Sequence, residues 1–131
     1  VLLQVMPYTS PLSGGISPGM ALCFQGTVAS NAKDFTINLQ SGPSNSDDRA
    51  FHFNPRMGQR VAMNSFRNGK WESEESASVE PFTSGILIPL QVYVNGFQHC
   101  LFKHRIPLEK VTTLIILKIN STSICLIYSG K

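Results

Sequence analysis

The chain has 131 residues, of which 42% are hydrophobic and 15% charged, and its formal net charge is +3. This length fits a single domain over residues 1–131, whose core needs no disulfides or metals to support it. The eleven Lys and Arg residues are scattered, which argues against a nucleic-acid partner. The apolar run at 114–119 is far too short to cross a bilayer, so we expect no membrane insertion.

The first part of the chain predicts an edge segment and two strands. Residues 7–19 contain three prolines and three glycines, which indicates an extended edge and a turn rather than a helix. Strands are expected over Met20–Val28 and Asp34–Gln40. In the second strand apolar residues alternate with polar ones, so we expect one buried face and one solvent-facing side. The polar stretch Ser41–Arg49 then predicts a loop.

The stretch from 51 to 76 concentrates polar groups on what is otherwise apolar strand sequence. His52, Asn54 and Arg56 alternate along it, so in an extended strand their side chains leave one face. Phe51 and Phe53 leave the other face and are expected in the core. The pattern predicts a strand with one apolar side and one row of hydrogen-bonding groups.

A tight hairpin is expected at the Asn-Gly pair at 68–69, because this dipeptide favours the backbone of a two-residue turn. The turn would fold Trp71 back beside a strand over Val61–Ser65. Trp71 and Glu74 are three residues apart, so strict alternation would place them on opposite faces. For both to reach one ligand, a bulge near Glu72–Ser73 is required.

The rest of the chain continues as short strands separated by turn residues. We expect strands over 91–95, 97–102, 113–119 and 123–128, with an Asn-Gly turn at 95–96. Regularly spaced short strands with Gly, Pro or Asn turns are typical of a two-sheet antiparallel sandwich. The predicted fold class is therefore all-β.

Several motifs, in their order along the chain, resemble the carbohydrate-recognition domain of the galectins: His52-x-Asn54-Pro55-Arg56, a strand ending in Asn64, Trp71-x-x-Glu74, Pro81-Phe82-x-x-Gly85, Val94-Asn95-Gly96, His104-Arg105-Ile106-Pro107-Leu108 and Val111-Thr112-Thr113-Leu114. The resemblance extends from about Pro7 onward. It implies a jelly-roll form of the sandwich, which the strand pattern alone does not give. It also implies a lectin, without a cofactor, that binds β-galactosides of the lactose and N-acetyllactosamine type on glycoproteins or glycolipids.

The resemblance also implies the carbohydrate-binding residues, which are His52, Asn54, Arg56, Asn64, Trp71 and Glu74. The first three match family positions that hold the axial 4-hydroxyl and the ring oxygen of galactose. Asn64 and Glu74 match those that bind the 6-hydroxyl and, with Arg56, the adjoining sugar. An axial 4-hydroxyl leaves one face of galactose as a patch of C–H bonds, which the planar ring of Trp71 can cover. We expect Arg56 and Glu74 to form a charge-assisted pair before ligand binds.

Two departures from the family pattern concern the second sugar. The pattern often continues Trp-Gly-x-Glu-x-Arg, whereas here Glu72 replaces the glycine and Ser76 stands in place of the arginine. The second cation of the network is then missing, and Arg60 or Arg67 is the candidate replacement. Candidate residues of an extended subsite on the neighbouring strand are Asp34, Thr36 and Asn38.

The segment between Gly85 and Val94 is a further departure, because it is too short for the two strands that galectins usually place there. Either the deletion is real, or this sequence lacks residues that the intact protein has. A real deletion would make Pro89 a crossover and leave a neighbouring sheet edge open to pairing or dimerisation.

Cysteine and histidine usage predicts neither a disulfide framework nor a metal site. Cys23, Cys100 and Cys125 all lie in apolar sequence, and their number is odd. His99 and His104 flank Cys100, but no partner pair at zinc-site spacing accompanies them. The amino end has no basic flank and no small-residue cleavage site, so no secretory leader is expected. Together with the resemblance, this predicts a cytoplasmic protein that also reaches the extracellular space by leaderless secretion.

Two other function classes stay open. An enzyme could use His52 and Glu74 as base and acid, but glycoside hydrolysis needs two carboxyl groups flanking the bond, and a Glu74 tied to Arg56 stays ionised. We therefore expect no enzymatic activity. The alternative to the lectin is a galectin-fold protein-interaction module with weakened or lost sugar binding. Because one domain has one site, cross-linking of glycans requires a homodimer or a tandem-domain parent.

Overall fold

The computed structural model describes residues 8–12, 15–16, 20–27, 33–77, 87–93, 105–117 and 120–128, and the structural statements below concern these residues. They form ten strands and one short 3₁₀ helix. In chain order these are β1 (Tyr8–Pro11), β2 (Met20–Thr27), β3 (Thr36–Gln40), β4 (Arg49–Arg56), β5 (Arg60–Arg67), β6 (Lys70–Trp71), β7 (Glu75–Ala77), β8 (Leu87–Tyr93), η1 (Leu108–Lys110), β9 (Thr113–Leu117) and β10 (Asn120–Tyr128).

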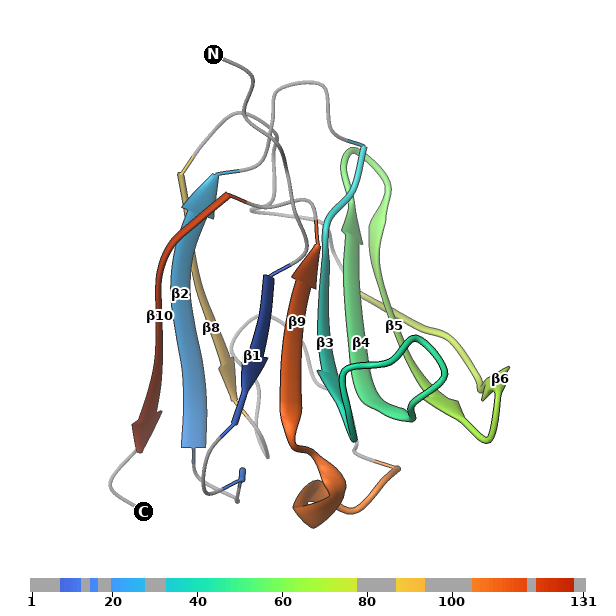
Figure 1. Ribbon diagram of the computed structural model, residues 1–131. Helices are drawn as coiled ribbons and strands as arrows, with labels where there is room; N and C mark the ends of the chain where they lie inside the picture. Colours follow the sequence, from blue (N-terminus) through green and yellow to red (C-terminus); the bar gives the residue numbers. More distant parts are fainter. Residues whose placement is uncertain are drawn as a thin grey trace.

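The strands form two antiparallel sheets, which Figure 1 shows as two groups of arrows whose neighbours point in opposite directions. The larger sheet has the order β1-β9-β3-β4-β5-β6, and β7 also pairs with β5. The described part of the smaller sheet has the order β10-β2-β8. Strands from the two ends of the chain pair in both sheets, β1 with β9 and β2 with β10. The predicted all-β, two-sheet antiparallel jelly-roll sandwich is confirmed.

The described core is built on one face of the larger sheet. Its largest members are Phe35, Ile37, Leu39, Phe51, Phe53, Val61, Met63, Leu114 and Ile116, all at most 5% exposed. Burying one such side chain contributes about 1.5–3 kcal/mol relative to leaving it in water. Because successive strand residues point to opposite faces, this packing turns the polar residues between them to the other face of the sheet. The predicted inward direction of Phe51 and Phe53 is confirmed.

The polar side of β3 is buried, so the prediction of a solvent-facing side is wrong. Thr36, Asn38 and Gln40 are 8%, 4% and 1% exposed. The reason is that β3 lies between β9 and β4, whose side chains cover it from both sides. Its polar groups are hydrogen-bonded: Thr36 Oγ1 accepts from the Asn54 side chain, and Gln40 Nε2 donates to a loop carbonyl. The alternation itself is confirmed.

The hairpin between β5 and β6 forms as predicted. Asn68 and Gly69 have φ angles of 55° and 79°. Two successive positive values are the requirement of a type I′ turn, which glycine and asparagine meet at least cost. The turn pairs Trp71 with Phe66 and so places the indole against the end of β5.

The bulge predicted after Trp71 is also present. Phe66 pairs with Trp71, but Met63 pairs with Glu75, so the 71–75 stretch carries one residue more than the part of β5 that it faces. An extra residue of this kind re-aims the side chains beyond it. Both Trp71 and Glu74 can therefore face the polar side of the sheet.

The remaining strand predictions are confirmed where the structure describes them. The expected edge segment contains β1, which pairs with β9 at one end of the larger sheet. Strands β2, β9 and β10 lie within two to three residues of their predicted ranges. The predicted turn at 95–96 and strand at 97–102 lie outside the described residues.

The short segment after Gly85 contains a strand rather than a crossover. β8 begins at Leu87, earlier than the predicted 91–95, and pairs with β2. Pro89 lies inside it with Gln25 as its partner, so Pro89 does not mark a crossover. Proline has no N–H to donate and is tolerated where one side of a strand needs no donor.

Candidate functional site

Polar residues from three neighbouring strands form a line across the face of the larger sheet opposite the core. The register pairs His52 of β4 with Asn38 of β3 on one side and with Asn64 of β5 on the other. The Trp71 ring lies beside this line, with its centroid 4.6 Å from that of His52 and the two planes at 60°. The sheet ladder therefore fixes the relative positions of these groups.

His52 presents a neutral imidazole with a free acceptor. Its Nδ1 lies 2.6 Å from Oδ1 of Asn38. An amide oxygen only accepts hydrogen bonds, so Nδ1 carries the proton and Nε2 is the acceptor. Burial, first, and then the charges of Arg49 and Arg56 lower the pKa of His52 to about 4. The ring therefore stays neutral at physiological pH and can accept a hydrogen bond from a ligand hydroxyl.

Asn54 lies below the surface and orients Arg56. The asparagine is 6% exposed, and its Nδ2 donates to the Phe35 carbonyl at 2.7 Å and to Thr36 Oγ1 at 3.2 Å. Its Oδ1 accepts from Nε of Arg56 at 3.0 Å. This contact fixes the plane of the guanidinium, and no hydrogen bond of the described residues to Asn54 uses its Nη groups.

The predicted pair of Arg56 and Glu74 is present as a long ion pair, but the hydrogen bond that holds Glu74 comes from Arg60. Arg60 Nη2 donates to Glu74 Oε2 at 2.6 Å, whereas Arg56 Nη2 lies 3.8 Å from Oε1. Arg56 and Arg60 are register partners at the end of the β4–β5 ladder, which brings both cations to one carboxylate. The hydrogen bond from Arg60 is the main cause that lowers the pKa of Glu74. Arg60 is thus the second cation of the network.

Trp71 has an exposed ring face and a fixed edge. It is 46% exposed, and it is the one exposed large hydrophobic residue of the described part of the chain. The Phe66 ring meets it edge-on, with centroids 5.1 Å apart. The guanidinium carbon of Arg49 lies 5.2 Å from the indole centroid and 4.7 Å from that of Phe66, within the range of cation–π contacts. These neighbours hold the indole as a platform.

Glu72, which stands where the family pattern has glycine, is tied to the end of β5. Ser65 Oγ donates to its Oε1, and Arg67 donates to both carboxylate oxygens at 3.0 and 3.2 Å. The hydrogen bonds from Ser65, first, and Arg67 lower the pKa of Glu72. Arg67 is therefore engaged by Glu72 and does not replace the missing cation beside Glu74.

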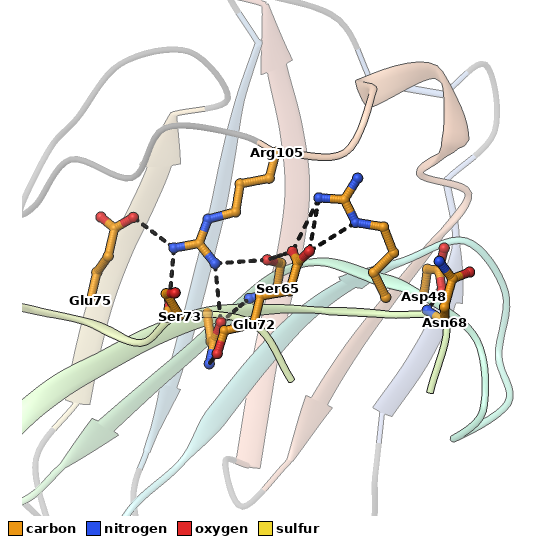
Figure 2. A network of polar contacts seen from close by, with 9 residues as sticks. Asp48, Ser65, Asn68, Glu72, Ser73, Glu75 and Arg105 are labelled. Carbon is orange, nitrogen blue, oxygen red and sulfur yellow. Dashed lines mark hydrogen bonds and ion pairs between the residues drawn. The ribbon is translucent and has the colours of Figure 1, made fainter. Parts of the chain in front are cut away.

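Arg105 connects the bulge to the polar line (Figure 2). Its Nη1 donates to Asn64 Oδ1 at 3.1 Å and to Ser65 Oγ at 2.9 Å. Its Nη2 donates to the Ser73 carbonyl at 2.7 Å and to Glu75 Oε2 at 2.8 Å. The figure shows this guanidinium between Glu75 and Ser73 on one side and Ser65 on the other. Arg105 thereby holds Asn64 and the segment after Trp71 in one arrangement.

These side chains surround a pocket of about 470 Å³. It is lined by His52, Arg56, Ala62, Asn64, Trp71, Glu72 and Glu74. Five of the six predicted site residues line it, and the sixth, Asn54, lies beneath Arg56. The pocket combines one aromatic face with converging donors and acceptors, which is the chemistry that a neutral sugar needs.

A second pocket of about 370 Å³ adjoins the first and shares His52 with it. Its lining residues are Thr9, Thr36, Asn38, Gln40, Pro43, Asn45, Arg49, His52, Ile115 and Leu117. Thr36 and Asn38, two candidates for an extended subsite, are among them, whereas Asp34 is not. Asp34 instead forms an isolated backbone bridge with Arg56.

Sequence reasoning missed three residues of the site region. Arg105 and Ser65 support the pocket wall, and Arg49 packs on the indole. Arg105 lies 41 positions from Asn64, its partner, so no local spacing could connect the two. The sequence pattern assigns Arg49 to the polar loop. Three residues before His52, it would point to the opposite face under strict alternation, but the bulge between the two positions returns it to the face of His52.

The described residues were also searched for a metal site and for a membrane-spanning helix. No group of three or more His, Cys, Asp or Glu side chains there is arranged to hold a metal ion. His99, Cys100 and His104, where we expected no metal site, lie outside the described residues. In the same part of the chain, no helix has the length and apolar character to span a membrane.

Comparison with known proteins points to one family. A family model described as galactoside-binding lectin matches residues 7–124. Galectin-4 from Bos taurus is 39% identical over 120 residues, which cover 83% of this chain and 36% of the relative. Galectin-7 from Homo sapiens is 37% identical over 118 residues, covering 81% and 85%. A solved structure of a human galectin-16 variant has a TM-score of 0.83 at 26% identity, covering 97% of this chain and all of that one.

The chain is shorter than its relatives in two respects. It spans little more than a third of the length of galectin-4. In addition, 83% of 131 residues is about 109, so the 120-residue alignment includes galectin-4 positions that this chain lacks. The second difference agrees with the short segment after Gly85.

The order of strands, the polar line on one sheet face and the matching family model agree with one another. The family model matches nearly the whole chain, and two different galectins, galectin-4 and galectin-7, are 39% and 37% identical to it. The chain therefore belongs to the galectin family of galactoside-binding lectins.

Proposed function

We propose that this domain binds β-galactosides of the lactose and N-acetyllactosamine type, through His52, Asn54, Arg56, Asn64, Trp71 and Glu74. One observation carries the proposal: an exposed indole face and the Nε2 acceptor of a neutral His52 border the same pocket of about 470 Å³. Galactose needs both features, because its axial 4-hydroxyl points to one side of the ring and leaves the opposite face as a patch of C–H bonds. The same geometry disfavours glucose, whose equatorial 4-hydroxyl points away from the histidine.

Each proposed residue has a distinct role in binding. His52 Nε2 accepts the proton of the axial 4-hydroxyl, and the Nη groups of Arg56 donate to that hydroxyl and to the ring oxygen. Asn54 acts mainly through Arg56, since its own polar groups are engaged within the sheet. Asn64 and Glu74 meet the 6-hydroxyl and the adjoining sugar. Trp71 stacks on the C–H face of the ring.

We propose that the domain does not hydrolyse the glycans it binds. A glycosidase needs one carboxyl group that stays protonated to donate to the leaving oxygen. Hydrogen bonds from Arg60 and Ser65, respectively, lower the pKa values of Glu74 and Glu72, so both stay ionised at neutral pH. Two ionised carboxylates bound to arginines suit hydrogen-bond acceptance rather than proton transfer.

The proposal extends to the setting of the domain. Residues 1–131 form one carbohydrate-recognition domain, with galactoside-bearing glycoproteins or glycolipids as partners in the cytoplasm and outside the cell. One domain holds one galactoside, so cross-linking of glycans requires a homodimer or a second domain in a longer protein. A cross-linking assay with a galactoside-bearing glycoprotein would distinguish a monovalent from a multivalent form.

Calorimetric titration with lactose tests the proposed site. Arg56→Ala should weaken binding about 10–100-fold, because a charge-assisted hydrogen bond contributes about 1.5–3 kcal/mol. The matched control is Lys110→Ala, which removes an exposed cation of η1 that does not line the pocket. Both variants should stay folded: Lys110→Ala should unfold like the parent protein, whereas Arg56→Ala should lose about 1 kcal/mol of unfolding free energy with its hydrogen bond to Asn54 Oδ1.

Two results would count against the proposed site. Equal lactose affinity in Arg56→Ala and Lys110→Ala would contradict the site assignment. Absence of any lactose binding by the folded parent protein would move the function to protein interaction. Release of free galactose during the titration would contradict the absence of catalysis.

A further inference from the structure

The turn between β5 and β6 combines an exposed asparagine with an unhindered glycine. Asn68 and Gly69 are both exposed, and a side-chain carbon added at Gly69 would meet nothing within 4 Å. The Asn68 N–H donates to Oδ1 of Asp48 at 3.1 Å, and Figure 2 shows these two residues side by side. None of the described residues, in contrast, accepts a hydrogen bond from the Gly69 N–H. The Gly69 nitrogen is therefore accessible to the side chain that precedes it.

An asparagine side chain next to such a nitrogen undergoes deamidation. The Gly69 nitrogen, once it has lost its proton, attacks the Cγ carbon of Asn68, and ammonia leaves as a succinimide ring closes. Water then opens the ring at one of its two carbonyl groups. One opening gives aspartate, and the other gives isoaspartate, in which the Cβ atom of residue 68 belongs to the main chain. Glycine favours ring closure because it has no Cβ that hinders the close approach.

The structure disfavours this reaction at the other asparagines whose side chains it describes. Asn45 is also exposed, but the N–H that follows it, that of Ser46, donates to Ser44 Oγ at 3.1 Å. The other three are at most 8% exposed: Asn38, Asn54 and Asn64. Among these side chains, that of Asn68 alone combines exposure with an unbonded nitrogen on the next residue.

The main chain of the turn determines where Trp71 lies. β6 consists of Lys70 and Trp71, and two residue pairs join it to β5, Phe66 with Trp71 and Arg67 with Lys70. Isoaspartate would add one main-chain atom between Arg67 and Lys70. A two-residue turn matches the spacing and twist of its strands only in a narrow range of conformations. The extra atom therefore shifts the short strand that carries the indole.

The new charge acts on the same hairpin. Both products place a carboxylate at residue 68, next to the Asp48 carboxylate that now accepts its N–H. Like charges at this distance repel each other and weaken the contact between the hairpin and the loop before β4. The centroids of the Trp71 and His52 rings are 4.6 Å apart, so a shift of the hairpin separates the two groups that border the pocket.

We propose that Asn68 is a modification site, at which spontaneous deamidation to isoaspartate displaces Trp71 and so weakens sugar binding as the protein ages. The effect on affinity rests on the proposed function, whereas the covalent change does not. Ring closure rotates the peptide group after Asn68 out of its orientation in a type I′ turn, so the reaction occurs while the turn is briefly open. An exposed turn beside a two-residue strand opens more readily than the core strands do.

Peptide mass spectrometry of the intact protein, stored at mildly alkaline pH, tests the covalent step. We expect residue 68 to exchange its side-chain amide for a carboxyl group, with isoaspartate identified by electron-transfer fragmentation. Asn45 should stay unchanged over the same period. Asn68→Gly has no side-chain amide and accepts the positive φ of the turn, so this position should not change in the variant.

Calorimetry with lactose on fresh and stored protein tests the consequence. The isoaspartate form should bind lactose about tenfold more weakly, because the indole no longer meets the sugar in register. Asn68→Gly should bind like the fresh parent protein before and after storage. Fresh Asn68→Asp carries the charge without the added main-chain atom and should lose less affinity than the isoaspartate form.

The outcomes separate this inference from the proposed function. If Asn68 stays intact, or Asn45 reacts as fast, the inference is overturned and the proposed function stands. Isoaspartate with undiminished affinity, an equal loss in stored Asn68→Gly, or an equal loss in fresh Asn68→Asp also overturns it. If the fresh parent protein binds no lactose, the proposed function fails. The mass spectra and the Trp71 fluorescence of stored protein then decide on the modification and the displacement alone.

Discussion

Replacing Asn54 by alanine should destabilise the fold as well as the site. The side chain is 6% exposed and makes three hydrogen bonds, to the Phe35 carbonyl, Thr36 Oγ1 and Arg56 Nε. At about 1 kcal/mol for each hydrogen bond, the free energy of unfolding should fall by about 3 kcal/mol. That loss is a large part of the roughly 5–15 kcal/mol that stabilises a typical domain. Lactose affinity should fall too, because Arg56 loses the contact that fixes its plane.

Urea unfolding followed by Trp71 fluorescence and circular dichroism measures this change. The matched control is Asn45→Ala, an exposed asparagine of the loop before β4, for which we expect a change within about 0.5 kcal/mol. The slope of the unfolding free energy against urea should be equal in all three proteins, so that midpoints report stability. An Asn54→Ala protein as stable as the control would refute the role assigned to these three hydrogen bonds.

Three further predictions follow from the same contacts. First, lactose affinity measured by calorimetry should stay constant from about pH 7.5 to 5, because burial lowers the pKa of His52 to about 4 and the ring stays neutral above that value. It should fall only as the pH drops through about 4, and a midpoint near 6.5, the ordinary histidine value, would contradict the assigned state. Second, Arg60→Ala should weaken lactose binding severalfold by releasing Glu74, yet change the unfolding free energy by less than about 1 kcal/mol, since both side chains are about two-fifths exposed. Unchanged affinity in the calorimeter would argue against Arg60 as the second cation. Third, Arg105→Ala should lower the unfolding free energy by about 2 kcal/mol, because hydrogen bonds to a charged group are worth about 1.5–3 kcal/mol. In the same urea assay Arg67→Ala should cost less than about 1 kcal/mol, and equal losses would contradict the connecting role of Arg105.

Local pattern was sufficient to predict the strands that carry the site. Alternation placed Phe53 in the core and His52 on the opposite face, and the Asn-Gly pair at 68–69 positioned Trp71. The spacing between Trp71 and Glu74 even required the bulge that the register shows. These features depend on neighbours in sequence, which a period of two and known turn geometry describe well.

Features that depend on contacts between distant strands were not predictable. The burial of Asn38 follows from the position of β3 between two other strands, which the sequence pattern does not contain. The choice of Arg60 over Arg56 as the partner of Glu74 depends on side-chain reach at the end of one ladder. Arg105 joins the site from a segment far along the chain. The order of strands in the sheet and the direction of each side chain, rather than residue type, determine these burials and partners.

The most direct test of a galactoside site is a fluorescence titration of Trp71, the one tryptophan of the chain, with lactose and with cellobiose. The two disaccharides differ only in the configuration at carbon 4 of the terminal sugar, the position assigned to His52. We predict a saturable change in Trp71 emission with lactose and none with cellobiose at equal concentrations. The same response to both sugars, or a response to neither, would contradict the claim that His52 and Trp71 together select an axial 4-hydroxyl.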